Sequence, residues 1–184
     1  MGKPLYEAGL HAAIDKYGNE IDPSASLIER ACILGLAWRI DTGYTTLAAD
    51  GDYTLINFKT PATGTCYYTL ASIDKSGNEV IVSLVRAGTV AAGTEGVGFN
   101  YDDNITTACP LTDITLGGTV ADGVERFESL LPGAGTPATK TGGTSRALGL
   151  IKLRPDTMYS VKLLAKGGAV TLAGNVGIAY YPAA

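Results

Sequence analysis

The residue pattern that most constrains the fold is a series of short segments in which apolar and polar side chains alternate. Residues 53–59 alternate in this way, and turn-forming groups at 50–52 and 61–64 flank them. Alternation of this kind is typical of strands, because successive side chains point to opposite faces. About eight such segments, with no helical pattern between them, predict an antiparallel β-sandwich. The pattern does not distinguish an immunoglobulin-like from a jelly-roll topology.

Two of these segment pairs predict β-hairpins. Cys66–Ile73 and Val80–Val85 flank the Gly- and Asn-containing stretch 74–78, and Met158–Ala165 and Val170–Tyr181 flank Lys166-Gly167-Gly168. Two other segments are expected to contain strands: 44–48 forms a short strand, and 105–116 forms a strand pair or one long strand interrupted by Pro110. Between the strands, we expect a loop at 89–98, a long surface loop at 130–145 and a turn at 154–157.

The stretch from Leu27 to Ile40 supports two interpretations. Ser26 and Glu29 form a capping box, and Leu27, Ala31, Leu34 and Trp38 share one helical face. Alternation from Cys32 to Ile40 favours a half-buried strand instead, and Gly35 weakens both interpretations.

Residues 1–26 form a separate N-terminal arm in this interpretation, and residues 27–184 form the sandwich domain. Pro4, Gly9, Gly18 and Pro23 prevent one long helix, although near-helical spacing from Leu5 to Ile14 leaves a short helix open. The arm has too few apolar residues for its own core, so we expect it to need a partner surface. We expect the contacts with that partner surface to come from Pro4, Leu5, Tyr6, Leu10, His11 and Ile14.

Charge and histidine content limit the chemistry. The net charge is −4, and the 14 Lys and Arg residues form no basic run, which argues against a nucleic-acid partner. His11 is the one histidine, so a metal site that needs two or more histidines is excluded. A Ser-His-Asp triad would depend on this residue in the arm. The glycine clusters match neither phosphate-binding motif. We therefore expect no enzyme, no cofactor and no metal, with a glycosidase-like carboxylate pair as an open alternative.

The cysteines and the N-terminal sequence bear on the cellular compartment. Cys32, Cys66 and Cys109 are odd in number and widely spaced, so we expect free buried thiols rather than a disulfide framework. The N-terminus has no signal-peptide pattern, and the longest apolar stretch is much shorter than the ~20 residues of a membrane helix. We expect a soluble protein without a membrane partner, made in a reducing cytosol.

Two acidic patches and two tyrosine pairs are candidate binding residues. Asp50-Gly51-Asp52 and Asp102-Asp103-Asn104 could bind calcium, although Asp and Asn in turns commonly bond their own backbone. Tyr67-Tyr68 and Tyr180-Tyr181 could stack on sugars. Because neighbours in a strand face opposite ways, one tyrosine of each pair should belong to the core.

Several turn motifs resemble those of a phage virion protein family. The stretch from Gly143 through Leu153-Arg154-Pro155-Asp156-Thr157 to Leu163 resembles a Gly-rich loop followed by the family's "L-K-P-N-T" strand. Residues 57–61 resemble its "FKTP" strand end, residues 100–104 its "N-R-N-R-N" loop, and residues 115–123 its "DPTVTADGT" turn. The resemblance covers roughly residues 27–184, and the arm has no counterpart.

The resemblance implies a jelly-roll-like domain in which Leu27–Ile40 is a strand. It also implies a structural virion protein on the outer capsid surface, a homotrimer that binds the major capsid protein and stabilises the shell. The alternative is a receptor- or carbohydrate-binding module of a head or tail fibre. Independently of the resemblance, alternation predicts these largely buried residues: Trp38, Phe58, Leu70, Val82, Leu84, Leu163 and Ile178.

Overall fold

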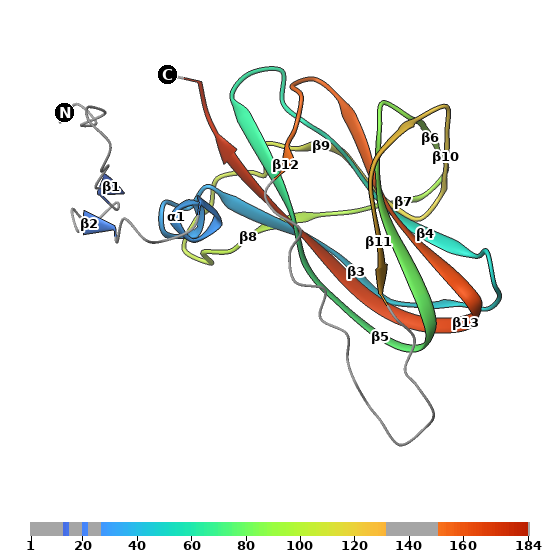
Figure 1. Cartoon of the computed structure of the whole chain (residues 1–184). Coiled ribbons are helices and arrows are strands. Elements are labelled where there is room, and N and C mark those ends of the chain that lie inside the picture. Colours follow the sequence, from blue (N-terminus) through green and yellow to red (C-terminus); the bar gives the residue numbers. More distant parts are fainter. Residues whose placement is uncertain (1–12, 15–19, 22–26, 132–150, 184) are drawn as a thin grey trace.

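A computed structural model describes residues 13, 14, 20, 21, 27–131 and 151–183, and the chain is nearly all β in these ranges (Figure 1). The elements are β1 (Ala13–Ile14), β2 (Glu20–Ile21), α1 (Leu27–Ile33), β3 (Ala37–Leu47), β4 (Tyr53–Lys59), β5 (Thr65–Arg86), β6 (Thr89–Ala91), β7 (Thr94–Glu95), β8 (Gly98–Asn100), β9 (Thr112–Leu116), β10 (Thr119–Ala121), β11 (Val124–Leu131), β12 (Ile151–Lys152) and β13 (Met158–Tyr181). The predicted antiparallel β-sandwich is confirmed, and the jelly-roll topology stays a prediction.

Two very long strands, β5 and β13, form the centre of the fold. They pair antiparallel over almost their whole length, from Tyr159 opposite Arg86 to Tyr181 opposite Thr65. Figure 1 shows the two strands curving together across the molecule. In each of the two strands, therefore, one half lies in one layer of the sandwich and the other half lies in the other layer.

The strands that flank this pair attach to one half of it or the other. β3 pairs with residues 170–179 of β13, and β12 pairs with the beginning of β5. β4 pairs with residues 158–164 of β13, and β11 pairs with the end of β5. Outer strands complete the two layers, β8 beside β3 and then β9 and β7 beyond β4.

Both predicted hairpins are wrong, because β5 and β13 continue through their glycines as bent strands. Lys166 lies opposite Glu79 and Val170 lies opposite Gly77, so Gly167–Ala169 face Asn78 alone. The extra residues form a bulge, and a bulge bends the strand that carries it. The Asn78 side chain donates to the Ala169 carbonyl at 2.9 Å and holds the bend. The local turn signal was correct, but it marks a corner where the strand pair passes between layers.

Leu27–Ile33 is a helix, so the strand prediction for this segment is wrong and strand structure begins only at Ala37. Glu29 lies in the first helical turn, as the capping-box interpretation requires. Ala31 is fully buried against Ala37 and Ala179. These small side chains let α1 approach the end of β13, and Gly35, at φ +68°, then ends the helix.

Other segment predictions need correction as well. Residues 44–48 are not a separate strand but the end of β3. Residues 89–98 are not simply a loop, since they include β6, β7 and the first residue of β8. Within 105–116 only Thr112–Leu116 is a strand. The turn at 154–157 is confirmed, whereas most of the loop expected at 130–145 lies outside the described residues.

The β6–β10 pair has a sequence signal that the segment predictions missed. The tetrapeptide Gly-Thr-Val-Ala occurs at 88–91 and again at 118–121, and the two copies pair antiparallel about Val90 opposite Val120. A residue with φ +58° follows each copy, Ala92 in one and Asp122 in the other. The repeat thus builds a small, nearly symmetric ribbon beside the main layers.

The main core lies between the two layers and takes side chains from both halves of β5 and β13. Trp38, Phe58, Val82, Leu84, Leu163 and Ile178 are all buried, as predicted, whereas the side chain of Leu70 lies outside the description. β4 is covered on both faces, since Leu55 and Asn57 are buried as well as Ile56 and Phe58.

Replacing Leu163 with Ala should lower the free energy of unfolding by about 2–5 kcal/mol, because the change leaves a cavity at the centre of the core. Leu130→Ala is the matched control, since Leu130 is 50% exposed and should change little. Urea denaturation of both variants measures the difference. A loss below about 0.5 kcal/mol for Leu163→Ala would contradict this packing.

Gly77→Ala should destabilise the chain by about 1–3 kcal/mol more than Gly43→Ala. Both glycines have positive φ, +99° and +67°, but an added Cβ at Gly77 would lie 2.7 Å from the Ala169 carbonyl oxygen, whereas nothing lies within 4 Å at Gly43. Thermal and urea unfolding of the two variants compare the costs. Equal losses would show that the corner at Gly77 does not need a glycine.

Candidate functional site

The predicted contact residues of the arm are mostly beyond what the structure describes. Pro4, Leu5, Tyr6, Leu10 and His11 lie outside the described residues. Ile14 lies in β1, which pairs antiparallel with β2, so a short helix extending through Ile14 is wrong. The role of these residues in contacts stays a prediction.

The first acidic patch closes a turn between β3 and β4. The Asp52 carboxylate accepts hydrogen bonds from the backbone amides of Ala48 and Ala49 at 3.0 and 2.9 Å. The Asp50 carboxylate accepts one from Gly167 at 2.7 Å, which ties this turn to the bend of β13. The two carboxylates are therefore occupied with backbone donors, as turn chemistry predicts.

The second patch is a chain of Asx turns after β8. The Asn100 side-chain oxygen accepts from the Asp102 amide at 2.8 Å, and the Asp102 carboxylate accepts from the Asn104 amide at 3.0 Å. Asn100 also donates to the Gly35 carbonyl at 2.9 Å, which fixes the loop to the corner after α1. Among the described residues, no three His, Cys, Asp or Glu side chains gather into a group that could hold a metal ion.

The tyrosine pairs pack inside the structure more than they face solvent. Tyr68 is 1% exposed and belongs to the core, and burial raises the pKa of its hydroxyl. Tyr180 is half-buried and meets Trp38 edge to face, and Tyr67 meets Tyr181 in the same way. One member of the first pair is thus a core residue, as expected.

The three cysteines are free thiols. Burial, together with the nearby Cys109, raises the pKa of the Cys66 thiol to about 12. Burial also raises the pKa of Cys32 and of Cys109. Since the thiolate is the nucleophile, these surroundings favour inert packing over reactivity.

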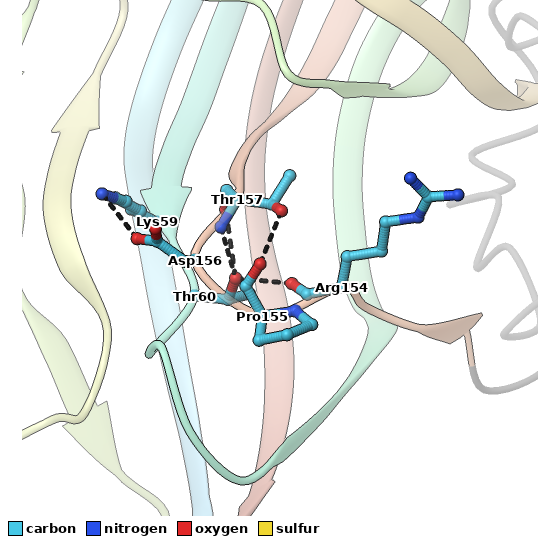
Figure 2. A network of polar contacts seen from close by, with 6 residues as sticks. All are labelled: Lys59, Thr60, Arg154, Pro155, Asp156 and Thr157. Atoms are coloured by element: carbon cyan, nitrogen blue, oxygen red, sulfur yellow. Dashed lines mark hydrogen bonds and ion pairs between the residues drawn. The ribbon is translucent and has the colours of Figure 1, made fainter.

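A polar clasp joins the end of β4 to the turn before β13 (Figure 2). The Thr60 hydroxyl lies 2.7 Å from the Arg154 carbonyl oxygen, to which it donates, and accepts a hydrogen bond from the Thr157 amide at 3.0 Å. The Thr60 amide donates to the Thr157 carbonyl, and the Asp156 amide donates to the Pro61 carbonyl. Thr60 is 2% exposed, so the bonds of its hydroxyl and amide are largely shielded from water.

An ion pair and an aromatic pair extend the clasp. Lys59 lies 2.8 Å from Asp156, and the hydrogen bond from this ammonium raises the pKa of Lys59. Both side chains are exposed, so we expect the ion pair to contribute little to stability. This small contribution is lost as the pH rises through the pKa of Lys59. Inside, the Tyr159 hydroxyl accepts from the Arg154 amide at 2.9 Å, and its ring stacks on Phe58. The clasp therefore reaches from the surface into the core.

A shallow groove of about 520 Å³ lies beside β8. Glu95, Asp102 and Asp103 supply its charged residues. Its apolar lining includes Val97, Phe99, Ile105, Cys109 and Ile114. The sequence predictions missed this site because residues 89–98 were interpreted as a loop, so Val97 and Phe99 were not expected to flank a strand edge.

Comparison with known proteins gives no match, whether to protein-family models, to curated proteins or to solved structures. Across the part of the chain that the structure describes, no helix has the length and apolar character needed to cross a membrane.

Thr60→Val should lower the free energy of unfolding by about 1–3 kcal/mol, because the Thr157 amide and the Arg154 carbonyl lose their partner, the buried Thr60 hydroxyl, while the side-chain volume is kept. The control is Thr46→Val, whose exposed hydroxyl contacts only that of Thr171 among the described contacts. We expect a change within about 0.5 kcal/mol for the control. Equal effects in urea denaturation would show that the clasp does not stabilise the fold.

Proposed function

We propose that this chain is a structural virion protein of a bacteriophage, which decorates the outer capsid shell as a homotrimer and stabilises it. Its partner in this proposal is the major capsid protein. One observation carries the proposal: the segments that resemble the family's "FKTP" and "L-K-P-N-T" motifs meet in the clasp (Figure 2). Lys59, Thr60 and Pro61 of the first bond to residues 154–157 of the second, although about a hundred positions separate them.

This contact supports a true resemblance to the family over a chance likeness. Two stretches that match the family's motifs by chance have no reason to lie together, whereas two parts of one structural motif do. The same contact favours a folding role for the motifs over a catalytic one, because Thr60 and Thr157 satisfy backbone groups. A scaffold with such a motif is compatible with a structural role.

The fibre-module alternative depends on stacking by the Tyr67-Tyr68 and Tyr180-Tyr181 pairs, and the described contacts of these pairs favour it less. Tyr68 is buried, and Tyr67 and Tyr181 contact each other. A decoration protein needs only binding area where shell subunits meet, and a standard interface buries ~1,600 Å². Three arms on a trimer would act together through effective concentration, so each contact can be weak.

The proposal predicts that the purified chain binds undecorated capsids assembled from the shell protein that the same phage genome encodes. Co-sedimentation measures the binding, and capsids saturated with the chain should rupture at a higher temperature than bare capsids. Light scattering should give three times the 19.0 kDa chain mass. A clean monomer at micromolar concentration would contradict the trimer.

Deletion of residues 2–22 locates the contact. The shortened chain should keep its circular dichroism spectrum and its trimer mass, because the strands of the sandwich lie after residue 26. It should lose most of its affinity for undecorated capsids. Unchanged affinity would show that the contact lies on the sandwich, and failure of both forms to bind capsids would overturn the proposed function.

A further inference from the structure

The short strand β8 presents one unpaired edge within the described part of the chain. It pairs with β3 alone, with Phe99 opposite Arg39. The Tyr101 amide donates to the Ala37 carbonyl, so Tyr101 and Phe99, two residues apart, are the residues that bond toward β3. The backbone groups of Gly98 and Asn100, which also line the groove, therefore point away from β3. An edge of this kind is a template for another strand.

Exposed apolar side chains stand at the same edge. Val97 is 58% exposed and Phe99 is 50% exposed. Single exposed apolar residues are ordinary, but these two line one groove together with Ile105 and Ile114. A Cβ at Gly98 would lie 2.5 Å from the Cys109 sulfur, so the backbone of β8 sits directly on this apolar lining.

The charges of the groove have one sign. Of the described residues, those that line it include three acids, Glu95, Asp102 and Asp103, and no base. The Arg39 side chain, across from Phe99, pairs with Asp41 at 3.3 Å. The Asx turns that begin at Asn100 hold the acidic loop in place, so the loop is arranged before any partner arrives. A cationic, partly apolar occupant complements this surface.

We propose that β8 and its groove bind an extended segment of a partner protein by strand addition, with a lysine or arginine of that segment facing the carboxylates of Glu95 and Asp103. Backbone bonds to Gly98 and Asn100 would supply affinity, and apolar side chains against Val97 and Phe99 would supply specificity. Pairing with the same edge of a second copy would oppose like charges, which is unfavourable. This inference is independent of the proposed capsid role.

A library of random ten-residue peptides displayed on yeast, screened against the full chain, tests the proposal. Enriched peptides should alternate apolar residues with others and carry a lysine or arginine. Synthetic copies should lose at least tenfold in affinity against Phe99→Ser, and against the double variant Glu95→Gln with Asp103→Asn. Methylating alternate backbone amides of the peptide should also abolish binding, because its side chains remain but its strand pairing is lost.

Matched controls distinguish peptide binding at this groove from non-specific binding elsewhere on the surface. Tyr44→Ser removes an aromatic ring that is 89% exposed on β3, and Glu125→Gln removes an exposed acid on β11. Both should bind the peptides as the parent chain does. Enrichment of no peptide, of acidic peptides, or of peptides insensitive to the groove variants or to methylation would overturn the proposal. Self-association of the chain that Phe99→Ser abolishes would also overturn it, since the occupant would then be a second copy.

Discussion

The antiparallel pairing of β5 with β13 is the interaction on which the rest of this structure depends. Each strand serves both layers, and β3, β4, β11 and β12 all attach to one of the two. The core between the layers is filled largely from the inward faces of this pair, including Val82, Leu84, Leu163 and Ile178. Loss of this pairing would separate the layers rather than remove one edge.

The bend at Asn78 makes this arrangement feasible. A flat strand pair of this length could belong to one layer only, whereas the bulge at Gly167–Ala169 turns both strands together. The Asp50 carboxylate bonds the Gly167 amide, so the turn between β3 and β4 supports the same corner. The clasp around Thr60 then fixes the far end of β4 to the beginning of β13. Polar bonds thus hold the corners, and apolar packing fills the space between them.

Strand β8 differs from the central strands because, among the described residues, it pairs with a neighbour on one side only. Its neighbours are a short helix corner and a loop of Asx turns, and its groove combines exposed Phe99 with one-sign charge. Strand edges in soluble proteins are usually protected by charge or by covering elements. In the proposed role of this edge, the acids discourage self-pairing and attract a partner of opposite charge.

Local pattern was enough to predict the β-sandwich, one buried face of β5 and of β13, and the turn chemistry. Alternation named Phe58, Leu84 and Leu163 as core because a strand's period is two, whatever the strand pairs with. The Asp and Asn turns followed from side chains that bond their own backbone. The helix at Leu27–Ile33 was one of two local solutions, and its packing through Ala31 on Ala179 selected it.

What only the tertiary structure decided is how the segments connect and where they meet. A Gly- and Asn-rich stretch signals a reversal or a corner equally well, and Gly77 became a corner because its partner on β13 bends with it. The clasp of Thr60 with Arg154 and Thr157, and the groove beside Phe99, join residues far apart in the chain. Local sequence determines backbone preference and the buried face, whereas long-range pairing is a property of two segments at once.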